Sequence, residues 1–199
     1  FGTSNDFLIG HDSTNTRLYN YTGNLQITNF ADDQDIIFQC DDGSGGVETY
    51  FFLDGSASAG APFTVFPDSS NLTIGTGFDL RLKHDGSHSY IQQTGTGDLY
   101  IQNTVNDKDI IFQSDDGSGG VETYFFLDGS NGLTTFPDDK VLGFGNASDL
   151  RIKHDGSNSY IIQQGTGDLI IQNTADDEAI IFQCDDGSGG VETYFQLEG

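Results

Sequence analysis

The 199-residue chain carries 31 Asp and Glu against 7 Lys and Arg, a formal net charge of −24. This charge repels polyphosphates and anionic lipids, which argues against nucleic acids and membrane surfaces as partners. The longest apolar run, 50–53, is far shorter than the roughly 20 residues of a membrane-spanning helix, and no signal peptide is recognisable.

Large apolar side chains are scarce. The apolar residue types make up only 35% of the chain, and Trp and Met are missing. The chain reaches the roughly 45–50% of an average globular composition only when its 27 glycines are counted as well. A free-standing module of this composition would be only marginally stable. We therefore expect other copies of the chain to supply the missing burial.

The string Asp-Asp-Gly-Ser-Gly-Gly-Val-Glu-Thr-Tyr-Phe occurs unchanged at Asp41, Asp115 and Asp185, so the chain repeats with a period of about 70 residues. It divides into 1–55 (a first repeat truncated at its N-terminal end), 56–129 (a joint plus the second repeat) and 130–199 (a joint plus the third). The joints are 56–74 and 130–144. Both chain ends fall inside the repeat, from which we expect a window cut from a longer chain.

Short runs rich in Ile, Leu, Phe, Tyr, Val and Thr, bounded by Gly, Asp, Asn and Ser, predict strands, and no helical periodicity is present. In and before the second repeat the expected strands are 63–66, 72–74, 79–84, 89–93, 98–103, 109–114 and 121–127. The strand 79–84 alternates apolar and polar residues. The strands 109–114 and 121–127 are apolar on both faces, as expected when neighbouring chains cover both sides.

The predicted fold class is all-β: a repetitive, elongated β-fibre or β-solenoid of units of about 70 residues, assembled as a homotrimer. The Asp-Gly pairs at 85–86 and 155–156 predict two-residue hairpins with positive φ. The first repeat has Asp12 and Ser13 at this place, so we expect a different, looser turn there.

Three histidines, His11, His84 and His154, are each followed by Asp. In a three-fold bundle they could form a metal or proton-relay site, but a partly buried His bonded to its own turn is the simpler interpretation. Cys40 and Cys184 occupy one repeat position, and we expect them to be free and half-buried rather than joined in an interchain disulfide. The basic residues Arg81, Lys83, Arg151 and Lys153 predict ion pairs with carboxylates across strands or chains.

Paired aspartates at the glycine-rich hairpin tips are the candidate metal ligands: Asp41, Asp42, Asp115, Asp116, Asp185 and Asp186. Carboxylates and loop carbonyls suit Ca²⁺, although no stretch fits an EF-hand or nonapeptide β-roll loop. We interpret the tips as solvated, with no cofactor required and Ca²⁺ as the candidate ion. Asn20, Asn71 and Asn146 begin glycosylation triplets that matter only in a glycosylating host.

The strings Asp-Leu-x-Ile-x-His-Asp-Gly-Ser-x-Ser-Tyr-Ile, Gly-Asp-Leu-x-Ile-Gln-Asn-Thr and Ile-Ile-Phe-Gln-x-Asp-Asp-Gly-Ser-Gly-Gly resemble repeats in structural and tail-fibre-like proteins of marine tailed phages, especially those of cyanobacteria. The resemblance spans 6–199. It implies a fibrous, homotrimeric protein of a virion or an extracellular appendage, and it carries over no functional residue.

We therefore predict a non-enzymatic structural protein: a shaft segment of a phage tail fibre or a similar filament, continuing end to end. Catalytic motifs such as a nucleophile elbow or a phosphate loop are missing, and a depolymerase would need turnover that we do not expect. The alternative is a repetitive carbohydrate-binding adhesin that contacts host-surface glycans. Its candidate stacking platforms are Tyr90, Tyr100 and Tyr160, although core packing explains these tyrosines equally well.

Overall fold

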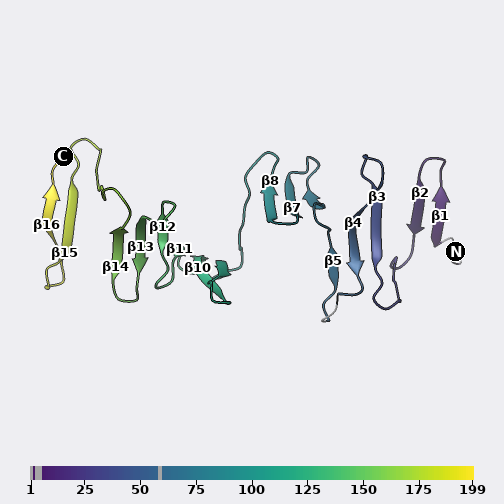
Figure 1. Cartoon of the computed structure of the whole chain (residues 1–199), viewed down its shortest axis with the longest axis horizontal. Coiled ribbons are helices and arrows are strands. Elements are labelled where there is room, and N and C mark those ends of the chain that lie inside the picture. Colours follow the sequence, from purple (N-terminus) through teal and green to yellow (C-terminus); the bar gives the residue numbers. More distant parts are fainter. Residues whose placement is uncertain (1, 3–5, 58–59) are drawn as a thin grey trace. The chain divides into compact units, whose positions relative to one another are not determined.

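A computed structural model describes residues 2, 6–57 and 60–199, and within them all regular structure is β-strand (Figure 1). The strands form small antiparallel sheets, each made of strands that follow one another in the sequence. The prediction of an all-β chain is therefore confirmed. The described residues include no helix with the length and hydrophobicity needed to cross a membrane.

The chain divides into two halves, Phe1–Tyr100 and Ile101–Gly199. The first half contains a hairpin, a three-stranded sheet and a second three-stranded sheet, each paired in chain order. Their strands are β1 (Phe7–His11) and β2 (Thr16–Asn20); β3 (Ile36–Asp41), β4 (Val47–Asp54) and β5 (Phe63–Val65); and β6 (Asn71–Ile74), β7 (Leu80–His84) and β8 (Ser89–Gln93).

The second half repeats the two three-stranded sheets and adds a closing hairpin. Its strands are β9 (Ile110–Asp115), β10 (Val121–Asp128) and β11 (Leu133–Thr135); β12 (Leu142–Phe144), β13 (Leu150–His154) and β14 (Ser159–Gln163); and β15 (Ile180–Asp185) and β16 (Val191–Leu197).

Six of the seven strands expected around the second repeat form within a residue or so of the predicted bounds, as β5 to β10. The prediction of a seventh strand, at 98–103, is wrong for a single chain, since no strand forms there. The physical reason is the lack of a partner. The backbone of this segment makes no hydrogen bond within the described residues, and a strand is defined by such bonds.

The β3–β4 hairpin and its two counterparts share one irregularity. Phe38 pairs with Phe51 and Gln39 with Thr49, which leaves Tyr50 as an extra residue in the ladder. The same shift occurs in β9–β10 and β15–β16, at Tyr124 and Tyr194. An extra residue of this kind is a β-bulge, which bends the strand and re-aims the bulged side chain.

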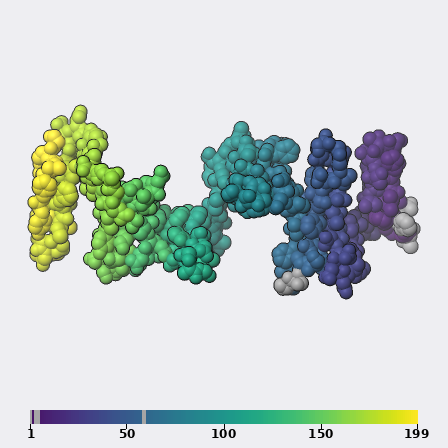
Figure 2. Space-filling view, viewed as in Figure 1, coloured from purple at the N-terminus to yellow at the C-terminus, as the bar shows by residue number. Residues whose placement is uncertain are grey.

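None of the described residues is buried. Figure 2 shows the β1–β2 and β3–β4 hairpins as single narrow layers. The best-packed apolar group is a ladder of stacked rings in which Phe51 lies 4.5 Å from Phe38 and 5.7 Å from Phe66. Phe125 repeats this at 4.4 Å from Phe112 and 5.5 Å from Phe136. The ring of Phe66 or Phe136 thus fastens each joint to the preceding sheet.

The turns correct two details of the sequence analysis. In the β7–β8 hairpin only Gly86 has positive φ, while the Asp85 carboxylate accepts the amides of Ser87 and His88. In the β1–β2 hairpin Ser13 takes the glycine's place at φ 77. The Asp12 carboxylate accepts the next two amides in the same way, so this turn is not looser.

Candidate functional site

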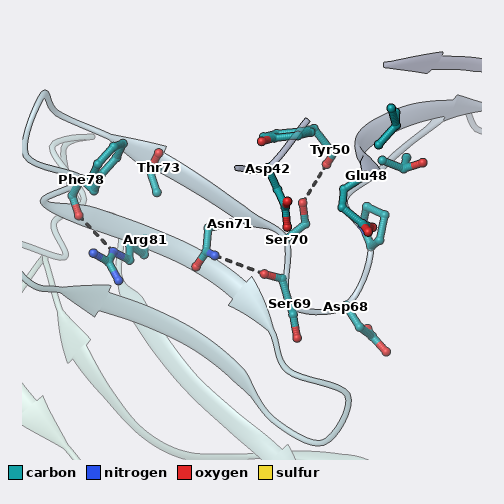
Figure 3. Close-up of a pocket in the computed structure, with 13 residues that line it drawn as sticks. Asp42, Glu48, Tyr50, Asp68, Ser69, Ser70, Asn71, Thr73, Phe78 and Arg81 are labelled. Atoms are coloured by element: carbon teal, nitrogen blue, oxygen red, sulfur yellow. Dashed lines mark hydrogen bonds between the residues drawn. The ribbon is translucent and has the colours of Figure 1, made fainter. Parts of the chain in front are cut away.

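An open hollow at the first joint has a volume of about 770 Å³. It opens between the tip end of the β3–β4 hairpin, the turn that follows β5, and the β6–β7 strands (Figure 3). We call it the joint pocket. It is lined by Asp42, Val47, Glu48, Thr49, Tyr50, Pro67, Asp68, Ser69, Ser70, Asn71, Thr73, Phe78 and Arg81.

The bulge in β4 and the turn of the joint bring the two sides of the pocket together. The Ser70 hydroxyl donates to the carbonyl of Tyr50 at 2.8 Å, which ties the joint to the bulge. The amide of Ser69 donates to the carbonyl of His84 at 2.7 Å, which ties the same turn to the end of β7. Ser69 has φ 66, a conformation uncommon outside glycine, and these two anchors hold it there.

The joint pocket has an acidic end and a basic end. Asp42 and Glu48 lie beside Tyr50, whereas Arg81 lies at the far end beside Phe78 (Figure 3). Arg81 donates from Nε to the carbonyl of Phe78 at 3.2 Å, and Glu48 has no ion-pair partner among the described residues. The hydroxyl and amide of Ser44 hold the pKa of Asp42 below its usual value. At the acidic end, the carboxylates of Asp42 and Glu48 and the ring of Tyr50 therefore offer a polar lining that can accept a cation.

The equivalent place at the second joint is occupied by a lysine. Lys140 stands where the first joint has Ser70, and its ammonium lies 2.6 Å from a carboxylate oxygen of Glu122. It also lies 5.8 Å from the centre of the Tyr124 ring. The side chain of Lys140 is only 18% exposed. Glu122 and Tyr124 correspond to Glu48 and Tyr50. The second joint therefore shows that a glutamate and a tyrosine in these positions can hold a positively charged ammonium group.

The aspartates predicted as metal ligands lie at the exposed hairpin tips, two in each repeat. Their carboxylates are engaged by the tip itself: Asp41 accepts the amide of Gly43 at 2.6 Å and Asp42 that of Ser44 at 2.8 Å. The same bonds recur at Asp115, Asp116, Asp185 and Asp186. Among the described residues no three His, Cys, Asp or Glu side chains gather as metal ligands would. The calcium assignment therefore stays a prediction.

The histidines bond across their own hairpins, as the simpler interpretation predicted. Nδ1 of His84 lies 3.1 Å from the Ser89 hydroxyl, and His154 and Ser159 repeat this contact. They are exposed rather than partly buried, because the hairpins that carry them are single layers. Cys40 and Cys184 form no disulfide within the described chain and are exposed rather than half-buried for the same reason, while the prediction against an interchain disulfide is not tested.

Within the described residues of one chain, the basic residues on the matching strands form no ion pair with a carboxylate, and their expected pairing with another chain stays a prediction. Lys83 lies over the ring of Tyr90 at 5.0 Å, and Lys153 lies over that of Tyr160 at 5.3 Å. The hydroxyl of Tyr160 donates to Asp155 at 2.8 Å, and this bond raises the pKa of the phenol. A lysine therefore covers one face of each ring. The third candidate platform, Tyr100, is 77% exposed.

Sequence reasoning did not find the joint pocket, because its lining comes from three elements spread over 42–81. One signal was available. The joints align at the Phe-Pro-Asp of 66–68 and 136–138, and two positions later the first has Ser70 where the second has Lys140.

No family model matches the chain, and neither a curated protein nor a solved structure is significantly similar to it.

Proposed function

We propose that this chain is a structural segment of a fibre, the shaft of a phage tail fibre or of a similar extracellular appendage, in which several copies run side by side. The observation that carries the proposal is an all-β repeat whose described residues include none that is buried. A shaft needs the same piece many times and no unique site. The resemblance of the repeat strings to tail-fibre-like proteins supports the same role and a location on a virion or outside a cell.

The accessible surface of the chain leaves room for extensive burial against other copies. The 21.5 kDa chain exposes 15863 Å². A compact monomer of that mass exposes about 9,200 Å², so the excess is about 6,700 Å². A standard interface buries about 800 Å² on each partner, so the excess is enough for extensive contact with more than one neighbour.

The exposed apolar residues lie on both faces of the hairpins. On β3, Ile37 is 54% exposed and its neighbour Phe38, on the opposite face, is 39% exposed. The corresponding residues of β9 and β15 behave alike. Strands that are apolar on both faces are expected where both faces are covered. Two covering neighbours per chain, the arrangement of a homotrimer, would provide this.

Sedimentation equilibrium of the 199-residue chain tests the assembly. We expect a species of three times the 21.5 kDa chain mass, and electron micrographs that show an elongated particle. A folded monomer, stable to dilution, would contradict the proposal. Two or four chains per particle would keep the fibre and correct the number.

Like charges must be screened when copies with a net charge of −24 lie side by side. We therefore expect the melting temperature to rise with NaCl, and to rise further in Ca²⁺ if the paired aspartates of the tips bind the ion. A chelator added in high NaCl separates the two effects, since only bound Ca²⁺ responds to it. A melting temperature that ignores salt and chelator alike would show that the tips lie too far apart to repel.

The joint pocket favours a second candidate function, a carbohydrate-binding adhesin. An aromatic ring, carboxylates and a side-chain amide are typical of sugar-binding sites, and the joint pocket presents Tyr50, Glu48 and Asn71 together. A glycan array on the isolated chain tests this candidate. Saturable binding that is lost in Glu48→Gln and Asn71→Ala would favour the adhesin, while a silent array would leave the shaft as the better proposal.

A further inference from the structure

Three segments of the chain have sequences typical of strands but pair with no other strand among the described residues. They are 24–30, 98–104 and 168–174, and we call them the unpaired segments. Each follows a turn and precedes another, and neither a turn nor a bend interrupts it. No residue inside them has positive φ. The backbone is therefore straight enough to be a strand without being part of a sheet.

The hydrogen-bonding groups of these segments are unused. Within the described residues, no backbone N–H or C=O of the three unpaired segments bonds to another part of the chain. The side chain of the sixth residue, an asparagine in each segment, bonds only to the turn that follows: the side-chain amide of Asn103 donates to the carbonyl of Asp109, and its oxygen accepts the backbone amide of Val105. A row of free backbone donors and acceptors is a template for another strand.

The side chains of these segments are apolar and exposed. Leu and Ile recur two residues apart and so on one face: Leu99 is 43% exposed and Ile101 60%, and the pairs in the other two segments are similar. The opposite face carries Tyr100 at 77% and, in the third segment, Ile170 at 73%. A strand exposed in this way on both faces has packing to gain on both.

We infer that the unpaired segments are the strands through which copies of this chain pair with one another. This inference rests on the proposed assembly and names its contact. In it, the backbone of 98–104 forms ladder hydrogen bonds with a strand of a neighbouring copy, and Leu99 and Ile101 are covered by that neighbour. The segments at 24–30 and 168–174 do the same, so the chains are joined once in every repeat.

Charge identifies the partner as a second copy of this chain. Charged residues make up 19% of the sequence, yet 25–30, 99–104 and 169–174 contain none. Two chains that each carry −24 can approach most easily where neither is charged. A basic partner would instead be drawn to the acidic tips. Uncharged segments of high β-propensity without Pro or Gly are also the type that pairs with itself.

Hydrogen–deuterium exchange on the assembled 199-residue chain tests the pairing. The geometry of the single chain predicts that the amides of 99–103 exchange as fast as those of Gly45 and Gly46 in the exposed tip, which donate no hydrogen bond within the described residues. Interchain pairing predicts that they exchange more slowly than the tip by about tenfold or more, approaching the amides of β9. An assembled chain in which 99–103 exchange as fast as the tip overturns the pairing and leaves the fibre proposal standing. A chain that sediments as a monomer overturns both.

Proline substitution gives a second measurement that does not depend on exchange. Neighbouring amides in a strand point to opposite edges, so Ile101→Pro and Gln102→Pro between them remove a donor from each edge. Ile101→Ala and Gln102→Ala are the matched controls. Since neither amide is bonded within the chain, proline costs no hydrogen bond in a single copy. We expect a lower melting temperature and faster subunit exchange for at least one proline variant than for its control. Proline and alanine variants that behave alike at both positions would overturn the inference.

Discussion

The two joints have nearly the same backbone and different side chains. In the first, the amide of Ser69 bonds to the carbonyl of His84 at 2.7 Å and that of Ser70 to Pro67 at 2.9 Å. In the second, Asp139 bonds to His154 at 2.7 Å and Lys140 to Pro137 at 3.0 Å. The positive φ falls on Ser69 and Asp139 alike. The backbone conformation of the joint, and the hydrogen bond by which it contacts the following sheet, are therefore the same in both repeats.

The two joints differ in the side chain at the end of the turn, which determines whether the neighbouring glutamate is open to solvent or ion-paired. Ser70 is short and bonds to the carbonyl of Tyr50, leaving Glu48 open to solvent. Lys140 reaches back over the bulge to Glu122 and Tyr124. The residue at this position thus distinguishes a polar, acidic pocket at the first joint from an ion pair at the second. The joints differ at this position, whereas the hairpin tips that begin at Asp41, Asp115 and Asp185 are identical.

Removing the joint phenylalanine should cost both joints the same. Phe66 and Phe136 are each 38% exposed and stack on the ring of the preceding sheet. We expect Phe66→Ala and Phe136→Ala each to lose about 2 kcal/mol of local stability, from lost burial and ring contact. Hydrogen exchange at β5 and β11 measures each joint separately. A large loss at one joint alone would show that the aromatic ladder is not the shared fastener.

Exchanging Ser70 and Lys140, the residues at the end of the turn, should move the ion pair and the cation–π contact from the second joint to the first. Lys140→Ser removes an ion pair and a cation–π contact, and we expect β11 and β12 to lose about 1 kcal/mol. Ser70→Lys should add a similar contact to Glu48 and close the joint pocket. Lys140→Gln keeps most of the length of the side chain without its charge and serves as the control. The loss should shrink as NaCl rises, and a loss that is the same at every salt concentration would point to packing rather than charge.

Much of this architecture was readable from the sequence, because turn residues and alternation are local. The hairpins around Gly86 and Gly156 and six of the seven strands follow from them. The prediction of a strand at 98–103 was wrong, and the reason lies in what a strand requires. Its residues favour a strand, but forming one takes a partner, and the chain does not provide it. A sequence can encode a strand that a single copy of the chain leaves unpaired.

The joint pocket could not be predicted because it depends on register. Tyr50 lines it only as the extra residue of a bulge, and alternation along β4 does not reveal which residue that is. The expected pairing of Arg81 and Lys83 with carboxylates on neighbouring strands is not found among the described residues for a related reason, while their pairing with another chain stays a prediction. Lys83 faces Tyr90 directly across the β7–β8 ladder, so the nearest partner is a ring.

The smallest expected effect is a change in the pKa of Asp54 and Asp128, the last residues of β4 and β10. Asp128 accepts two hydrogen bonds from Ser130 and two from Asn131, and the Asn131 side chain is the main reason that its pKa falls to about 2. Asp54 lacks one of these donors, because Ala57 stands where the second joint has Asn131. Its pKa is lowered chiefly by the Ser56 hydroxyl.

Because folding depresses these pKa values, the carboxylates stabilise the fold above their ordinary pKa of 3.8. That contribution disappears as pH falls through the folded-state value, for Asp128 between 3.8 and about 2. Asn131→Ala should raise the pKa of Asp128 and narrow this window, whereas Ala57→Asn should lower that of Asp54. An NMR titration of the two carboxyl carbons measures both directly. If the two substitutions left the titrations unchanged, solvent rather than the Asn131 amide would be setting the pKa of these exposed groups.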